Sequence, residues 1–152
     1  MAQVRFSGTF TALVTPFAAG GERVDFGALE RLVEDQIAGG VSGLVACGTT
    51  GEAATLSDAE QGEGIARVAK VAAGRVPAIA GSGTNCTARS IARSRAALEA
   101  GADGVMVVMP YYNKPSQQGM REHVLAVSRA AGCPIILYNI PGRSVVDLSV
   151  ET

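Results

Sequence analysis

The chain has 152 residues, enough for one domain with a sizeable buried core. Hydrophobic residues make up 47% of it and charged residues 18%, a composition that excludes a disordered chain. The net charge is −1, with acidic and basic residues interspersed, so the chain lacks the basic surface that nucleic acid or a membrane attracts. We therefore expect neither kind of partner.

The cysteines and the apolar segments indicate a cytoplasmic protein. Cys47, Cys86 and Cys133 are far apart and have neither a disulfide nor a zinc spacing. We interpret Cys47 and Cys133 as small core residues. No apolar segment is typical of a signal peptide or long enough for a membrane span. No motif for a cofactor or a metal is present, so none is expected.

Five apolar runs predict strands that are buried on both faces. They span residues 11–14, 43–47, 77–80, 105–109 and 134–138. Each of the last four follows a helical stretch that ends in Ala-Gly, where glycine can adopt the left-handed conformation that ends a helix. The repeat of about 30 residues is typical of strand–helix units in a parallel sheet.

Four helices are predicted between these strands from their capping residues and their apolar spacing. Asp25 is expected to begin the first helix, and Ser57 the second, where Glu60 completes a capping box. Thr87 and Ser116 are expected to cap the third and fourth. The residues predicted on the inner faces are Leu29, Leu32, Val33 and Ile37; Ile65, Val68, Ala69 and Ala72; Ile91 and Leu98; and Met120, Val124 and Val127.

Alternating strands and helices fit either an open doubly wound sheet or a (β/α)8 barrel. A dinucleotide-binding open sheet typically has a G-x-G-x-x-G turn after its first strand. Here Gly81-Ser82-Gly83 follows the third strand, and Cys86 stands where the third glycine would be. The chain also has no GK[ST] phosphate loop. These features favour an α/β fold of the (β/α)8 TIM-barrel type, of which the chain supplies about five strands and four helices.

Polar strings follow three of the predicted strands, at residues 48–52 (G-T-T-G-E), 110–115 (P-Y-Y-N-K-P) and 138–143 (Y-N-I-P-G-R). Because a parallel barrel gathers its strand ends at one face, we expect the three strings to meet at one site. Tyr111 and Tyr112 are adjacent on an extended segment and point opposite ways, so at most one of them faces a site in its own subunit. Taken alone, each string also fits an ordinary polar loop or packing tyrosines.

The side chains in these strings suit small anions and proton transfer. The N–H groups of the glycine turn and the hydroxyls of Thr49 and Thr50 can bind a carboxylate. Tyr138 can shuttle a proton, and Arg143 can either bind a carboxylate with two hydrogen bonds or lie solvated at the surface. His123 is the only histidine and falls within the fourth helix, where we interpret it as structural or exposed. No histidine-based hydrolytic triad is therefore expected.

With residues 13–17 (L-V-T-P-F), the three strings resemble the dihydrodipicolinate synthase branch of the N-acetylneuraminate lyase superfamily over nearly the whole chain. The Thr-Thr pair in the glycine turn and Arg143 are similar to the synthases rather than to the sialic acid lyases. The resemblance implies a class I aldolase-type lyase. A lysine would form a Schiff base with pyruvate, and the enamine would attack aspartate semialdehyde. The product, 4-hydroxy-tetrahydrodipicolinate, leads to diaminopimelate and lysine.

The resemblance also implies a role for each site residue, without a cofactor. Thr50 and the N–H groups of its turn would hold the pyruvate carboxylate. Tyr138, Thr49 and Tyr112 would form a proton relay, with Tyr112 supplied by a neighbouring subunit of a homotetramer. Arg143 would hold the carboxylate of the semialdehyde.

The chain departs from the family's pattern in its lysines. In the family the Schiff-base lysine ends the next strand, which would lie beyond Thr152. Lys70 and Lys114 are the chain's two lysines, and neither stands at that position. We therefore interpret residues 1–152 as the N-terminal part of a single TIM-barrel domain and expect this chain alone to be inactive, with unpaired strand edges. Two alternatives stay open: another pyruvate-dependent aldolase or lyase, and a non-catalytic half-barrel that serves in assembly.

Overall fold

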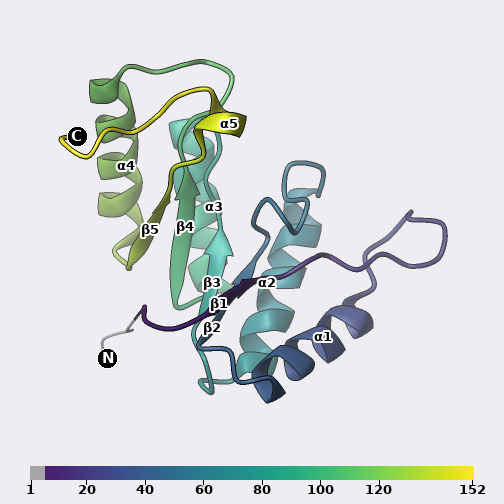
Figure 1. The fold of residues 1–152 in the computed structure, drawn as a ribbon. Helices are drawn as coiled ribbons and strands as arrows, with labels where there is room; N and C mark the ends of the chain where they lie inside the picture. The colour runs from purple at the N-terminus through teal and green to yellow at the C-terminus, as the bar shows by residue number, and fades with distance from the viewer. Residues whose placement is uncertain (1–5) are drawn as a thin grey trace.

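The computed structural model describes residues 6–152, which form a parallel sheet flanked by helices (Figure 1). The strands are β1 (Phe10–Ala12), β2 (Gly43–Ala46), β3 (Ala78–Gly81), β4 (Gly104–Val108) and β5 (Ile135–Tyr138). The helices are α1 (Phe26–Ala38), α2 (Asp58–Ala72), α3 (Thr87–Glu99), α4 (Gln117–Ala131) and the short α5 (Pro141–Ser144). The five predicted strands and four predicted helices are confirmed, and α5 was not anticipated.

The strands lie across the sheet in chain order, β1-β2-β3-β4-β5, and every neighbouring pair is parallel. A doubly wound sheet reverses its strand order at a switch point. The strands within residues 6–152 show no such reversal, so the barrel prediction holds against the open-sheet alternative. Helices α1 to α4 pack side by side in chain order, α1 on α2, α2 on α3 and α3 on α4. β1 and β5 are the two edges of the sheet.

The face of the sheet toward the helices forms the main core. Side chains alternate between the two faces along each strand. The strand residues on this face are Leu44 and Ala46, Ala78 and Ala80, and Val105 and Val107, and they join a buried cluster that includes Val33, Val68 and Val127 of the helices. Cys47 belongs to this cluster as predicted, whereas Cys133 only packs against it and is partly exposed.

The opposite face is filled at its amino end by aromatic rings. Phe6 and Phe10 pack edge to face with their centroids 6.0 Å apart. A Cβ atom at Gly43 of β2 would overlap the Phe10 ring, and one at Gly104 of β4 would lie 3.3 Å from Ile79 and 3.4 Å from the Phe6 ring. The rings therefore occupy the amino end of this face, and the open space lies at the carboxyl ends of the strands.

Three of the four predicted helix caps are confirmed. The side chains of Asp25, Ser57 and Ser116 accept hydrogen bonds from backbone N–H groups in the first turns of α1, α2 and α4, at 2.9, 3.2 and 3.2 Å. Glu60 completes the capping box, since its carboxylate accepts from the Ser57 N–H group at 2.9 Å. These caps depend on residues only three positions apart, so the sequence alone predicts them.

The predicted cap of α3 is wrong. Cys86 occupies the cap position and makes no side-chain capping bond. Thr87 already lies in the first turn, and its hydroxyl is 2.9 Å from Nδ1 of His123 on α4. The tertiary contact between α3 and α4 therefore takes the hydroxyl that the sequence assigned to the helix end. His123 is buried and structural, in agreement with one of the two interpretations of this residue.

The inner face of α3 also differs from the prediction. Ser90, Ser94 and Ala97 are its buried residues, while Ile91 and Leu98 are only partly buried. Small side chains let the helix lie close to the sheet, and the buried hydroxyls are satisfied because Ser94 Oγ lies 2.8 Å from Ser82 Oγ. On the other helices the predicted inner residues are buried except Leu32, Ile37, Ala69 and Val124, which are half-buried.

Several large apolar side chains are exposed, as expected for a sheet with open edges. Leu137 on the edge strand β5 is 47% exposed, and Val14 and Val145 are exposed as well. Across residues 6–152, no helix has both the length and the apolar character needed to cross a membrane. The same part of the chain contains no cluster of three or more His, Cys, Asp or Glu side chains that could hold a metal ion.

A Gly81→Ala substitution tests the close packing at the end of β3. Its Cβ would overlap the carbonyl oxygen of Cys47, so we expect a loss of about 1–3 kcal/mol in the free energy of unfolding. Gly62→Ala in α2 is the matched control, since its Cβ meets nothing and alanine favours the helix by about 0.5–1 kcal/mol. Urea unfolding measures both, and equal midpoints for the two variants would contradict the packing described.

The buried His123 predicts a dependence of stability on pH. Burial lowers the pKa of His123 below its ordinary value of 6.5, and Nε2 has no hydrogen-bond partner in the described part of the chain. The unfolded chain then binds more protons as the pH falls below 6.5, so the free energy of unfolding decreases over that range. We expect the loss in urea unfolding curves between about pH 7.5 and about pH 5. His123→Gln should flatten that part of the curve, and an unchanged pH dependence would contradict this role.

Candidate functional site

A cavity of about 370 Å³ lies at the carboxyl ends of β2 to β5. The register of β3, β4 and β5 explains which strand residues form the wall of this cavity. Gly81 pairs with Met106, and Val108 pairs with Tyr138, so these residues stand side by side on the face away from the helices. All four line the cavity. Its size is typical of sites for small molecules.

The glycine turn after β2, residues 48–52, forms one side of the cavity and is held in place by hydrogen bonds. The Thr15 hydroxyl donates to the Gly51 carbonyl at 2.6 Å, which ties the turn to the segment after β1. The N–H groups of Gly51 and Glu52 bond within the turn, to Gly48 and Thr49.

The two N–H groups that precede these in the turn are available to a ligand. Within residues 6–152 the backbone N–H groups of Thr49 and Thr50 have no hydrogen-bond acceptor. Thr49 lines the cavity, whereas the exposed Thr50 side chain is not among the lining residues. Two adjacent N–H groups without internal partners can bind a carboxylate.

Cys47 begins the turn and is not a reactive thiol. It has a φ of 52°, in the left-handed region, and it is buried. Burial raises the pKa of the Cys47 thiol to about 11, and the positive charge of Arg93 opposes part of that rise. The thiol therefore stays neutral near pH 7 and serves in packing rather than as a nucleophile. The buried Gln61 side chain donates to the Ala53 carbonyl at 2.6 Å and holds the end of the turn.

The tyrosine pair divides as the sequence predicts, with one ring toward the cavity. Tyr111 lines the cavity, and Tyr112 does not. Tyr112 is 87% exposed and has a φ of 72°, which turns the chain sharply at this point. The residue that the resemblance places in the proton relay is thus directed away from this subunit's own cavity. Its role with a neighbouring subunit stays a prediction.

The third string is shaped by hydrogen bonds that surround α5, which lies beyond the carboxyl ends of β4 and β5 (Figure 1). Asn139 donates from Nδ2 to the Asp147 carboxylate at 2.7 Å, and its Oδ1 accepts from the Leu148 N–H group at 3.1 Å. The buried Ser144 hydroxyl contacts the Ile140 carbonyl at 3.0 Å. These bonds close the turn that carries Arg143 to the cavity wall.

The structure brings together Thr49, Tyr138 and Arg143, which come from two separate strand ends and line one cavity. Thr50 and Tyr112 lie outside its lining. Lys70 on α2 and Lys114 in the tyrosine loop are both exposed, and neither lines the cavity. Of the five predicted site residues, three therefore share the cavity within this subunit.

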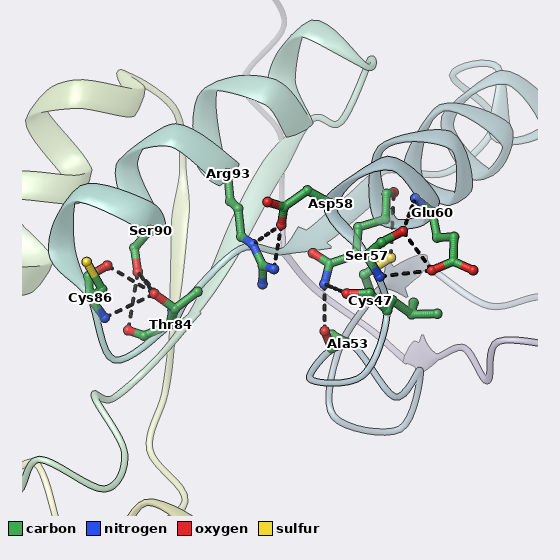
Figure 2. A network of polar contacts seen from close by, with 11 residues as sticks. Cys47, Ala53, Ser57, Asp58, Glu60, Thr84, Cys86, Ser90 and Arg93 are labelled. Carbon is green, nitrogen blue, oxygen red and sulfur yellow. Dashed lines mark hydrogen bonds and ion pairs between the residues drawn. The ribbon is translucent and has the colours of Figure 1, made fainter.

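The sequence interpretation missed Arg93 on α3. This residue lines the cavity, and its Nε and Nη2 donate to Oδ1 of Asp58 at 2.9 and 2.6 Å (Figure 2). The available signal was the stripe of small residues on α3. Ser90 and Ser94 face the sheet, and Arg93 lies between them on the turn that reaches the cavity.

Comparisons with known proteins show which family the chain resembles. Residues 5–152 match the model of the Dihydrodipicolinate synthetase family. The chain is 68% identical over 152 residues to the 4-hydroxy-tetrahydrodipicolinate synthase of Sorangium cellulosum (strain So ce56), and the match covers 100% of this chain and 50% of that protein. It is 55% identical over 147 residues to the synthase of Rhizobium meliloti, with 97% and 50% covered.

A solved structure gives the same result for the fold. The chloride-inhibited dihydrodipicolinate synthase from Acinetobacter baumannii, crystallised in complex with pyruvate, superposes with a TM-score of 0.93 at 47% identity. That match covers 95% of this chain and 50% of the other. The chain spans about half the length of the curated relatives it matches. Its five parallel strands form an open half-barrel, equivalent to half of the TIM barrel in those structures. By its sequence and its fold, the chain belongs to the dihydrodipicolinate synthetase family.

Proposed function

We propose that this chain supplies one wall of the active site of a 4-hydroxy-tetrahydrodipicolinate synthase. That enzyme condenses pyruvate with aspartate semialdehyde on the route to diaminopimelate and lysine. The observation that carries the proposal is the meeting of Thr49, Tyr138 and Arg143 around one cavity. The pyruvate complex of the Acinetobacter relative supports pyruvate as one ligand.

Pyruvate binds in this proposal through its carboxylate at the glycine turn. The N–H groups of Thr49 and Thr50 have no acceptor in the described chain. Their hydrogen bonds to a carboxylate are stronger than those to a neutral group, because the carboxylate oxygen is charged. The Thr50 hydroxyl, which is exposed, adds a donor from the rim of the turn. The keto carbon is then held near Tyr138 at the end of β5.

Proton transfer falls to hydroxyl groups. When an amine adds to the keto carbon, the carbinolamine must receive a proton to lose water, and the resulting iminium must lose a proton from its methyl group to form the enamine. After the enamine carbon attacks the aldehyde, the aldehyde oxygen takes up a proton. Tyr138 and Thr49 line the cavity, and each hydroxyl can both donate and accept. Tyr112 of a neighbouring subunit completes the relay in the proposed homotetramer.

The amine comes from outside these 152 residues in this account. Lys70 and Lys114 are exposed, and neither is among the residues that line the cavity. The chain then represents the N-terminal part of a single TIM-barrel domain and is inactive by itself.

Arg143 holds the carboxylate of the semialdehyde. If the enzyme is another pyruvate-dependent aldolase or lyase, a different aldehyde is preferred. If it is an assembly unit only, no activity is recovered.

Borohydride trapping tests the source of the amine. The 152-residue chain is incubated with pyruvate and borohydride and then weighed by mass spectrometry. Because neither lysine lines the cavity, we expect no increase in mass. The chain is then co-expressed with the half of the Sorangium cellulosum relative that it does not match. This co-expression should restore an adduct, located on the added half. An adduct on Lys114 or Lys70 would contradict the proposal.

Variants of the co-expressed pair test the assigned roles. Tyr138→Phe keeps the ring and removes the hydroxyl, so we expect kcat to fall by about 10²–10³. Arg143→Ala should mainly raise KM for the semialdehyde and leave pyruvate trapping intact. Arg129→Ala, on the outer side of α4, is the matched control. Kinetics with each aldehyde measure the effects. If Arg143→Ala abolished pyruvate trapping while Tyr138→Phe left it intact, the roles assigned to Arg143 and Tyr138 would be contradicted.

A further inference from the structure

Two arginines line the same cavity, although the proposed reaction assigns a role to only one of them. Arg143 reaches it from α5, and Arg93 reaches it from α3. Among the lining residues Glu52 is the one with a carboxylate. An arginine side chain that is only 21% exposed beside a cavity is positioned for a reason other than solubility.

The position of Arg93 is fixed by the helix that carries it. Ser94 Oγ lies 2.8 Å from Ser82 Oγ, and the Thr84 N–H group donates to Ser90 Oγ at 2.8 Å. All four of these residues are buried. The hydroxyls join α3 to the end of β3, so the helix cannot move without breaking buried hydrogen bonds. Figure 2 shows Arg93 extending from α3 between Asp58 on one side and Thr84 and Ser90 on the other.

The hydrogen bonds of Arg93 leave donors free for a ligand. A guanidinium has five N–H groups. Asp58 uses only one oxygen, Oδ1, which accepts from Nε and Nη2. Across residues 6–152, Nη1 of Arg93 has no acceptor. Asp58 therefore orients the guanidinium without using all of it. Since the Asp58 side chain is 69% exposed, it is well solvated and neutralises Arg93 only in part.

The positive charge of Arg93 acts on groups in the cavity wall. It opposes the burial that raises the pKa of Cys47, a residue of the cavity wall. A charge that acts on one wall atom also acts on a ligand in the space beside it. Arg143, by contrast, has no acceptor for its guanidinium among the described residues. The cavity thus offers two cationic hydrogen-bonding groups from different elements.

We propose that Arg93 is a second carboxylate-binding residue of this cavity, and that Arg93 and Arg143 together make it selective for small dicarboxylates over monocarboxylates. Asp58 holds the guanidinium of Arg93 in place and weakens its attraction for the ligand. This inference assigns a role to a residue that the proposed reaction leaves unused. It concerns binding alone and requires no catalytic lysine.

Isothermal titration calorimetry with a matched pair of ligands tests the proposal. Glutarate carries two carboxylates, and its monomethyl ester carries one on nearly the same carbon frame. We expect the protein to bind glutarate about tenfold more tightly than the ester, a difference of about 1.4 kcal/mol. No reactant is present, so failure of the proposed condensation leaves this ratio unchanged. Equal affinities for the two ligands, or no binding of glutarate, would overturn the proposal.

Three variants assign the preference to particular side chains. Arg93→Gln should remove most of the preference for glutarate, and Arg95→Gln is the matched control, since Arg95 lies on the outer side of the same helix and bonds to the Ala130 carbonyl. Asp58→Asn should instead tighten glutarate binding by about threefold or more, because the competing charge is lost while a hydrogen bond to Arg93 remains. Circular dichroism verifies that each variant is folded.

The Arg93 and Asp58 variants are expected to change glutarate binding in opposite directions, so each one tests the role of Arg93 separately. If Arg93→Gln does not fold, the Asp58→Asn variant still tests the role of Arg93 without altering it. An undiminished preference in Arg93→Gln, or weaker glutarate binding in Asp58→Asn, would show that the second carboxylate is not held by Arg93.

Discussion

The parallel register of β3, β4 and β5 decides which side chains can reach the cavity. Gly81 stands opposite Met106, and Val108 stands opposite Tyr138, all on the face away from the helices. A shift by one residue would turn Tyr138 toward the helices and a neighbouring apolar residue toward the cavity. The same face is filled at its amino end by Phe6 and Phe10, so space remains only where the strands end. Register and filling together place the site.

Short hydrogen bonds then hold the strand-end loops in place. The Thr15 hydroxyl fixes the glycine turn, Gln61 fixes the end of that turn, and Asn139 closes the segment that carries Arg143. None of these side chains is among those that line the cavity. They allow the N–H groups of the turn and the guanidinium of Arg143 to stay oriented without a ligand, which reduces the cost of ordering them when one binds.

Much of this arrangement could be predicted from the sequence because its causes are local. The caps at Asp25, Ser57 and Ser116 depend on neighbours three residues away, and the apolar runs give the strands directly. The convergence of Thr49 with Tyr138 followed from the rule that parallel strands end at one face. Each of these inferences needs only the order of elements along the chain.

The failures all involve contacts between distant segments. Thr87 was assigned to a helix end, but His123 from α4 takes its hydroxyl. The inner face of α3 was read from Ile91 and Leu98, whereas the close approach to β3 favours small serines. Arg93 was therefore missed, since its direction depends on that face.

Separate strand ends form a single anion-binding cavity, and every role given to the site residues depends on this claim. Titration of pyruvate into the isotopically labelled protein, followed through backbone amide resonances, tests it most directly. We predict that the largest shifts occur together in residues 48–51 and 138–143, with smaller ones at the Gly81 and Gly83 amides that line the same space. Shifts confined to only one of these segments, or centred on the outer helices, would contradict the claim.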